Sequence, residues 1–161
     1  DISKIKIGAF YNDELVGVMT FGNLRLALGS RYKKDTYELI RFATKTSVIG
    51  LASKMLTYFI NKYNPEKIIS YADRRWTSSK NNLYEKIGFS FVHSTEPNYW
   101  YINEKKLDCR IHRFVFRKSE LKKKLDLFDP KLSEWQNMQL NGYTRIWDCG
   151  NLKYEMNFNK K

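Results

Sequence analysis

The chain is poor in the residues that bind metals or cross-link small folds. It has two cysteines and two histidines in 161 residues, and Cys109 and Cys149 lie far apart without CxxC spacing. So few ligands argue against a zinc site, and they favour a reduced chain over a single disulfide, which stays an alternative. We therefore expect no metal and a cytoplasmic location.

Long apolar runs are also absent. No stretch approaches the ~20 apolar residues that a membrane-spanning helix needs, and the first residues lack the layout of a signal peptide. We expect no membrane partner. The chain begins with Asp1 rather than Met, which is compatible with a piece of a longer protein.

Acidic residues are outnumbered by basic ones. The chain has 29 Lys and Arg against 17 Asp and Glu, a net charge of +12, and the basic residues are spread over its whole length. Such a field attracts polyanions, and nucleic acid, in particular DNA, is the partner that it favours. The alternative is that the charge serves solubility and attracts a phosphorylated cofactor.

The pattern of apolar residues predicts an α/β (α+β) protein. Hydrophobic residues make up 42% and aromatic residues 16% of the chain, enough for one packed core. Alternation predicts a hairpin and strands, and three- and four-residue steps predict helices. The expected strands are 5–21 (a hairpin), 37–43, 68–73, 89–92, 99–102 and 112–116, with extended segments near 146 and 154. The expected helices are 47–63, 81–87, 119–127 and 131–140, and a basic loop or short helical excursion covers 22–35.

The junction between the strand at 37–43 and the first helix can bind an anion. A helix start exposes unpaired backbone N–H groups with a partial positive charge. The small residues Gly50 and Ala52 let a pyrophosphate approach these groups, and Ser53 and Lys54 add side-chain donors. The alternative is an ordinary helix entry whose small residues pack against the sheet.

Two motifs resemble the GNAT acyltransferase superfamily. Residues 47–52 read Ser-Val-Ile-Gly-Leu-Ala, similar to the family's Gln/Arg-x-x-Gly-x-Gly/Ala loop except for Ser47, and residues 81–89 carry a Tyr-x-x-x-Gly-Phe pattern after Asn81. The resemblance covers about residues 5–117. It implies a GNAT-like mixed, mostly antiparallel sheet with helices on both faces, and acetyl-CoA or another acyl-CoA as cofactor. We expect an acyltransferase domain over 1–118 and a C-terminal helical and extended extension over 119–161 packed on it.

The resemblance also assigns roles to residues. It implies that Tyr84 protonates the departing thiolate, with a packing tyrosine as the alternative. For the general base we prefer Asp73 over Glu38, because open α/β sheets place sites at the carboxyl ends of strands; a surface pairing of Asp73 with a neighbouring arginine is the alternative. The residues expected to bind the cofactor are Phe42, Ala43, Thr44, Val48, Ile49, Gly50, Leu51, Ala52, Ser53, Lys54 and Asn81.

Aromatic and basic residues near the expected strand ends suit a nucleic-acid substrate, since rings stack on bases and guanidinium groups bind phosphates. These residues are Arg41, Tyr71, Arg74, Arg75, Trp76, Tyr99, Trp100 and Arg113. Aromatic residues on a strand that merely form core are the alternative reading. The segments 70–73, 98–101 and 141–150 also resemble phage-encoded proteins of the GNAT fold, some found beside homing endonucleases and others similar to Mom-type DNA-modification enzymes.

The sequence therefore leaves three functions open. The first is an acyl-CoA-dependent N-acyltransferase acting on nucleic acid or a nucleic-acid-associated substrate. The second is a catalytically inactive GNAT-like DNA-binding module of a phage homing endonuclease. The third is an N-acetyltransferase for small molecules or proteins.

Overall fold

The structure, a computed structural model, describes residues 2–24 and 33–158. Most of the basic loop expected over 22–35 lies outside these ranges. The chain forms two compact units, one built from residues 1–95 and 151–161 and the other from residues 96–150. Each unit has its own cluster of buried apolar side chains.

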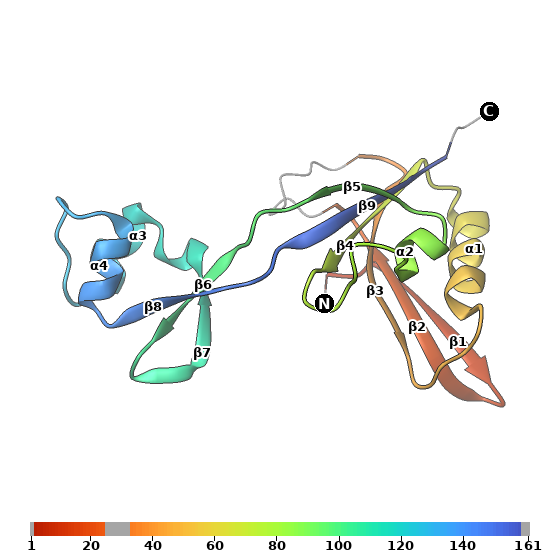
Figure 1. Cartoon of the computed structure of the whole chain (residues 1–161), viewed down its shortest axis with the longest axis horizontal. Coiled ribbons are helices and arrows are strands. Elements are labelled where there is room, and N and C mark those ends of the chain that lie inside the picture. The colour runs from red at the N-terminus through yellow and green to blue at the C-terminus, as the bar shows by residue number, and fades with distance from the viewer. Residues whose placement is uncertain (1, 25–32, 159–161) are drawn as a thin grey trace. The chain divides into compact units, whose positions relative to one another are not determined.

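The first unit is built on a six-stranded sheet in the order β1-β2-β3-β4-β9-β5 (Figure 1). Its strands are β1 (Ile5–Tyr11), β2 (Glu14–Gly22), β3 (Thr36–Thr44), β4 (Lys67–Asp73), β5 (Ser90–Ser94) and β9 (Asn151–Asn157). Neighbours pair antiparallel except β3 and β4, which are parallel. The expected mixed, mostly antiparallel sheet is confirmed.

The turn between β1 and β2 follows from its residues. Asn12 and Asp13 have φ angles of 47° and 62°. Two successive left-handed residues match the twist of a tight hairpin, and Asn and Asp tolerate that conformation. The hairpin expected over 5–21 is thus confirmed.

The long helix α1 (Leu51–Tyr63) follows β3 and buries a stripe of apolar side chains. Phe59 is fully buried and its ring stacks on that of Phe21 at 3.5 Å between centroids. The helix ends at Asn64, whose left-handed backbone and N–H bond to the Ile60 carbonyl close the last turn. The helix begins later than its apolar pattern predicts, because Val48 lies in the preceding loop.

The short helix α2 (Leu83–Lys86) lies on the same face of the sheet as α1. Tyr84 of α2 stacks on Tyr154 of β9, which belongs to the same buried cluster as Phe59 of α1. The two crossovers, from β3 to β4 and from β4 to β5, run the same way across the sheet. Right-handed crossovers in one direction put both helices on one face. Within the described residues of the first unit, α1 and α2 therefore share one face.

The second unit is a three-stranded sheet with short helices. The sheet has the order β7-β6-β8, formed by β7 (Lys106–His112), β6 (Tyr99–Asn103) and β8 (Tyr143–Trp147). The helical elements are the 3-10 turn η2 (Arg113–Phe116), α3 (Lys118–Lys124) and α4 (Glu134–Leu140). Tyr101, Phe116 and Met138 are in its core.

The strand expected over 112–116 is wrong. His112 ends β7, and its Nδ1 atom accepts a hydrogen bond from the Phe114 N–H, which starts η2. Phe116 is then buried against the rings of Tyr101 and Tyr143. The residues expected to form a strand instead form a tight turn, which buries the Phe116 ring and leaves the Phe114 ring exposed.

The domain boundary expected at 118 and 119 lies inside the second unit, and β9, from the expected extension, is an inner strand of the first unit's sheet. The division into an acyltransferase domain and an extension stays a prediction. Within the described residues, no helix is both long enough and apolar enough to cross a membrane.

Candidate functional site

The parallel strands β3 and β4 part halfway along their length. They pair from Thr36 and Lys67 as far as Leu39 and Ser70, whereas β3 continues to Thr44 and β4 to Asp73. At the point of parting, the buried hydroxyl of Ser70 donates to the Leu39 carbonyl at 2.9 Å. Beyond it, the backbone groups of β3 that point away from β2 have no strand partner among the described residues. A ligand with amide groups could therefore pair with this edge.

The start of α1 is open. Its N-cap is Gly50, with φ of 74°, and no side chain caps the helix and no acidic residue lies in its first turn. The Leu51 N–H donates to the Val48 carbonyl and the Lys54 N–H to Gly50. In the described part of the chain the amides of Ala52 and Ser53 have no acceptor. Free amides at a helix start attract an anion.

These two features meet in one pocket of about 290 Å³. The unpaired part of β3, the loop before α1, the first turn of α1 and one side of α2 line it: Phe42, Thr44, Ser47, Val48, Gly50, Leu51, Ala52, Ser53, Leu83, Lys86 and Ile87. Seven of the residues that the sequence predicts for the cofactor are in this lining: Phe42, Thr44, Val48, Gly50, Leu51, Ala52 and Ser53.

The remaining predicted cofactor residues lie elsewhere. Ala43 alternates with Phe42 and Thr44 and points to the other face of the sheet. Ile49 is 97% exposed at the tip of the loop. Lys54 lines a different pocket, and Asn81 precedes α2 with its N–H bonded to Glu85 at 2.6 Å.

Gly50 and Ala52 also have roles in the fold itself, and their expected contact with a pyrophosphate stays a prediction. A side chain at position 50 would meet no atom within 4 Å, so Gly50 is required for its left-handed backbone rather than for close packing. Ala52 is 8% exposed and belongs to the apolar stripe of α1. A third small residue, Gly17 of β2, leaves the space that the Leu51 side chain fills, because a Cβ there would lie 2.6 Å from Leu51 Cδ2.

Tyr84 is half-buried next to the pocket but does not line it. Its ring stacks on Tyr154 at 5.1 Å, and in the described residues its hydroxyl makes no hydrogen bond. Asn82 fixes this helix: its Oδ1 accepts from the N–H groups of Tyr84 and Glu85, and its Nδ2 donates to the Tyr154 hydroxyl at 2.5 Å. The role of Tyr84 as an acid stays a prediction.

The two candidate bases lie on the face of the sheet opposite to α1. Glu38 alternates with Tyr37 and Leu39, which pack in the core, and Asp73 alternates with the buried Ala72. Glu38 is 1% exposed. Arg41 and Tyr71, expected to contact the substrate, lie on this same face.

Asp73 forms the surface pairing that was its alternative role. Its carboxylate accepts from the Arg75 N–H at 2.8 Å and from the Arg75 Nη2 at 2.9 Å. These hydrogen bonds hold the pKa of Asp73 below its usual range, and the bond from the Arg75 side chain has the larger effect. A carboxylate with a lowered pKa is a weaker base, so the structure favours a role for Asp73 in the loop.

The loop that Asp73 holds presents Trp76 to solvent. The N–H groups of Trp76 and Thr77 donate to the Asp73 carbonyl, and the Trp76 ring is 82% exposed. The Arg75 guanidinium lies 5.8 Å from the ring centre. Arg74 is in the same turn, so a stacking surface and two cations follow the end of β4.

The other expected nucleic-acid residues, Tyr99, Trp100 and Arg113, belong to the second unit. Tyr99 and Trp100 are half-buried on β6, and the Arg113 guanidinium lies 5.4 Å from the Tyr99 ring centre. The Arg110 guanidinium lies 5.9 Å from the Trp100 ring centre.

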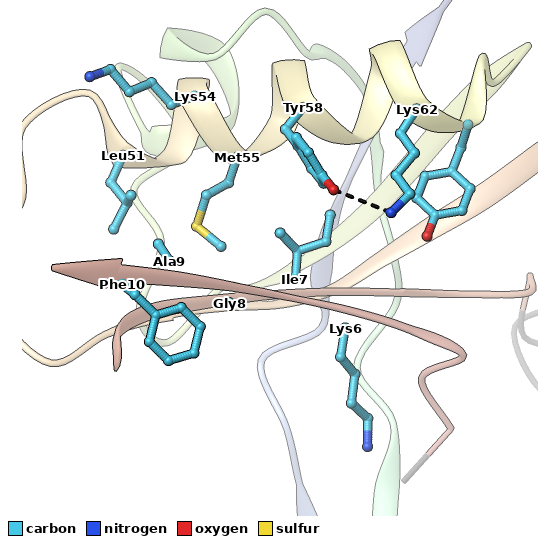
Figure 2. Close-up of a pocket in the computed structure, with 11 residues that line it drawn as sticks. Lys6, Ile7, Gly8, Ala9, Phe10, Leu51, Lys54, Met55, Tyr58 and Lys62 are labelled. Atoms are coloured by element: carbon cyan, nitrogen blue, oxygen red, sulfur yellow. Dashed lines mark hydrogen bonds between the residues drawn. The ribbon is translucent and has the colours of Figure 1, made fainter. Parts of the chain in front are cut away.

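A second pocket of the first unit, of about 440 Å³, lies between α1 and β1 (Figure 2). Leu51 and Met55 point from the helix toward Ile7 and Ala9, while Lys54 and Lys6 point away from this space. The Lys62 Nζ donates to the Tyr58 hydroxyl at 3.2 Å. Its lining mixes apolar side chains with the Tyr58 hydroxyl and the Lys62 ammonium, and none of the described residues that line it is acidic. The pocket at the start of α1 combines free helix amides with an unpaired strand edge, so it is the better candidate site.

Sequence reasoning missed part of the site. Leu83, Lys86 and Ile87 line the pocket from α2, and Ser70 marks the parting of the strands. The first three belong to the motif that was recognised, but which side of so short a helix faces the pocket depends on the packing of Tyr84 on Tyr154.

Comparisons with known proteins give structural similarity only. No family profile and no curated protein matches the chain. An acetyltransferase of Bacillus subtilis in complex with CoA is 19% identical, with a TM-score of 0.48 over 96% of this chain and 76% of that one. An IAA acetyltransferase of Bacillus cereus is 13% identical, with a TM-score of 0.49 over 95% of this chain and 77% of that one. A GNAT family acetyltransferase of Elizabethkingia anophelis with acetyl-CoA bound is 16% identical, with a TM-score of 0.49 over 95% of this chain and 75% of that one.

Because one fold can support many reactions, the activity of this chain has to be argued from its own site. The chain is similar in structure to acetyltransferases, one of them of the GNAT family.

Proposed function

We propose that the chain is an acyl-CoA-dependent N-acyltransferase. The observation that carries the proposal is the meeting, in one pocket, of an uncapped helix start and the unpaired edge of a strand. The first suits a diphosphate and the second suits an extended arm with amide groups. Acyl-CoA has both chemical features in one molecule.

The residues present fit this cofactor. The amides of Ala52 and Ser53 would hold the pyrophosphate, and the Lys86 ammonium on the opposite wall adds positive charge. The edge of β3 between Phe42 and Thr44 would pair with the amides of the arm, and one of its N–H groups would polarise the thioester oxygen. When bound, acyl-CoA supplies an activated acyl group for transfer to an amine.

In this proposal Tyr84 acts as the proton donor to the departing thiolate. A neutral phenol next to a developing thiolate lowers the barrier by proton transfer. The hydroxyl is available, since it makes no hydrogen bond within the described residues. The general base is the less determined role: Asp73 is paired with Arg75, and Glu38 is buried on the opposite face.

We further propose a nucleic acid, or a substrate bound to one, as the source of the amine. The net charge of +12 and the exposed Trp76 beside two arginines support it. A base turned out of a strand could stack on such a ring. This reaction would take place in the cytoplasm, where acyl-CoA is available.

The second candidate, a binding module without catalysis, is favoured by Ser47. This residue stands in the pocket lining where the acyltransferase loop has Gln or Arg. A module of this kind would bind DNA and ignore acyl-CoA.

A thermal-shift measurement with acetyl-CoA separates the two candidates. A ligand present at 100 times its dissociation constant adds about 2.7 kcal/mol to the free energy of unfolding, so the melting temperature should rise. Adenosine monophosphate, which lacks the diphosphate and the arm, is the matched control and should give a much smaller rise. An unchanged melting temperature at millimolar acetyl-CoA would exclude the transferase.

The acceptor is tested by transfer of labelled acetyl groups. The chain is incubated with labelled acetyl-CoA and either oligonucleotides or lysine-containing peptides of equal concentration. Label on the oligonucleotide supports the nucleic-acid acceptor. Label on the peptide alone would assign the third function, a protein N-acetyltransferase.

A further inference from the structure

The second unit carries a pocket that acyl transfer does not use. It has a volume of about 190 Å³ and is lined by Tyr99 of β6, Arg113 and Phe114 of η2, Arg117, and Glu134 of α4. Both arginines and Phe114 are exposed. The pocket therefore combines two cations, aromatic rings and one carboxylate.

The two guanidinium groups are held by rings rather than by carboxylates. Arg113 lies 5.4 Å from the ring centre of Tyr99 and 5.3 Å from that of Phe114, and Arg117 lies 4.8 Å from Phe114. Within the described residues, neither forms an ion pair. Stacking on a ring leaves the N–H edges of a guanidinium free for an anion.

The carboxylate in the pocket is already engaged. Glu134 Oε1 accepts hydrogen bonds from the hydroxyls of Tyr101 at 2.7 Å and Tyr99 at 3.4 Å. Burial, and then the bond to Glu134, raise the pKa of Tyr101, so its phenol remains a donor at neutral pH. Glu134 thus holds two rings in place and leaves both arginines to a ligand.

The aromatic surface continues beyond the pocket. Trp147 is 56% exposed and its ring lies 4.8 Å from that of Tyr99. The Arg145 guanidinium lies 4.5 Å from Tyr99 and 4.3 Å from Trp135. The Trp147 ring contacts that of Tyr99 directly, and from Tyr99 to Arg117 rings and guanidinium groups alternate. The rings of Trp147 and Phe114 keep area open to solvent.

We propose that this pocket binds single-stranded nucleic acid, with phosphates on Arg113 and Arg117 and bases stacked on Phe114 and Trp147. Stacking platforms beside phosphate-binding cations are how proteins bind single strands without reading sequence. An acidic peptide would use the cations and leave the rings idle. A duplex hides the faces of its bases and could not stack on them.

The proposal goes beyond acyl transfer and does not need it. The pocket lies wholly in the second unit, and no residue of the acyl-CoA pocket lines it. Binding can therefore be measured without acetyl-CoA. A Gly50→Val chain that no longer binds acetyl-CoA should still bind the strand.

The test uses the full chain and a fluorescein-labelled strand of twelve thymidines, with binding followed by fluorescence anisotropy over a series of salt concentrations. Two further probes have the same charge: an abasic strand of the same length, and an acidic peptide of glutamates. We expect the thymidine strand to bind at least about fivefold more tightly than either, since one stacked base gives this factor or more.

Variants then locate the site. Phe114→Ala should weaken binding of the thymidine strand by about 5- to 140-fold and leave the abasic strand unaffected. The double variant Arg113→Gln with Arg117→Gln should change the slope of the logarithm of the affinity against the logarithm of the salt concentration. We expect this slope to become less steep by about 1.4, that is about 0.7 for each phosphate that is no longer neutralised. Lys131→Gln, which removes an exposed charge of the same unit outside the pocket, is the control and should keep the affinity within about twofold.

Circular dichroism shows first that each variant is folded. Should the double variant unfold, Arg117→Gln alone replaces it, and the slope of the logarithm of the affinity against the logarithm of the salt concentration should then become less steep by about 0.7. Equal binding of the thymidine and abasic strands, or of the peptide, overturns the proposal. An effect of Lys131→Gln as large as that of the arginine variants overturns it as well.

Discussion

Individual side chains in this protein take their roles from their neighbours. Asp73, which the sequence favours as a general base, is paired with Arg75, and its pKa is lowered by that hydrogen bond. Tyr84 has its hydroxyl free in the described residues while its ring is fixed on Tyr154. The residue types were visible in the sequence, but their partners come from other elements and were not.

The role of Tyr84 is tested by removing one oxygen atom. Tyr84→Phe keeps the stacking on Tyr154, so we expect acetyl-CoA binding to remain and turnover to fall by about 10²- to 10⁴-fold, the usual contribution of a general acid. Steady-state kinetics and the thermal shift with acetyl-CoA measure the two effects separately. Tyr58→Phe is the matched control, because Tyr58 lies on α1 in the other pocket. Unchanged turnover in Tyr84→Phe would remove this residue from the mechanism.

Glu155 should make the first unit sensitive to acid. Burial alone raises the pKa of this carboxyl, but hydrogen bonds from Lys67 and Lys153 outweigh burial and lower it. A lowered pKa contributes stability above the ordinary value of about 4.3, and this stability is lost as the pH falls through the lowered value.

We expect Glu155→Gln to reduce the free energy of unfolding at neutral pH by roughly 1.5–3 kcal/mol, the range for hydrogen bonds to charged groups. The variant should also lose the part of the acid dependence that Glu155 contributes. Urea unfolding between pH 3 and pH 7 measures both. Glu96→Gln, at an exposed position of the other unit, is the control. The same acid dependence in both variants would contradict the assignment.

At the scale of elements, the junction of β3 and α1 forms the candidate site. The apolar period of α1 and the small residues before it predicted a helix start that can bind an anion. The actual start is at Leu51, because Gly50 adopts a left-handed backbone and turns the chain into the helix. Val48, expected both inside the first helix and among the cofactor residues, lies in the loop before α1 and lines the pocket.

Gly50→Val tests this start. A β-branched residue at φ of 74° costs about 1–2 kcal/mol and should displace the amides of Ala52 and Ser53. We expect the rise in melting temperature with acetyl-CoA to disappear. Gly142→Val is the matched control, since Gly142 has φ of 70° and lies in the other unit. A chain with Gly50→Val that still responds to acetyl-CoA would place the cofactor elsewhere.

Elements with a strong period were predictable, and those decided by single contacts were not. The hairpin of β1 and β2 follows from alternation, α1 from helical spacing, and β4 from a short apolar run. The strand β7 and the turn η2 were not predicted, because the His112 cap and the burial of Phe116 decide them. Local patterns do not contain such contacts between distant residues.

At the scale of the whole molecule, the sheet depends on a strand from the end of the chain. The strand β9 lies between β4 and β5 and pairs with both. Its residues Leu152 and Tyr154 are buried in the core of the first unit. The segment 96–150 is thus inserted between two neighbouring strands, β5 and β9.

A chain ended at Gly150 should therefore fail to fold its first unit. Without β9, two inner strand edges and the apolar surface around Phe59 become exposed, so we expect aggregation and loss of cooperative unfolding. Size-exclusion chromatography and thermal unfolding followed by circular dichroism measure this. A chain ended at Phe158 retains every described strand and is the control. A soluble, folded chain ended at Gly150 would support an acyltransferase domain that is complete by residue 118.

Composition and the spacing of neighbouring residues were enough to establish the class of the fold, the basic charge and the loop that could bind a diphosphate. The folded chain was needed to show that α1 and α2 share one face, that β3 and β4 part beside the start of α1, and that Asp73 is paired. Strand pairing, crossover direction and side-chain contacts join residues far apart in the chain, and no local pattern encodes which of them meet.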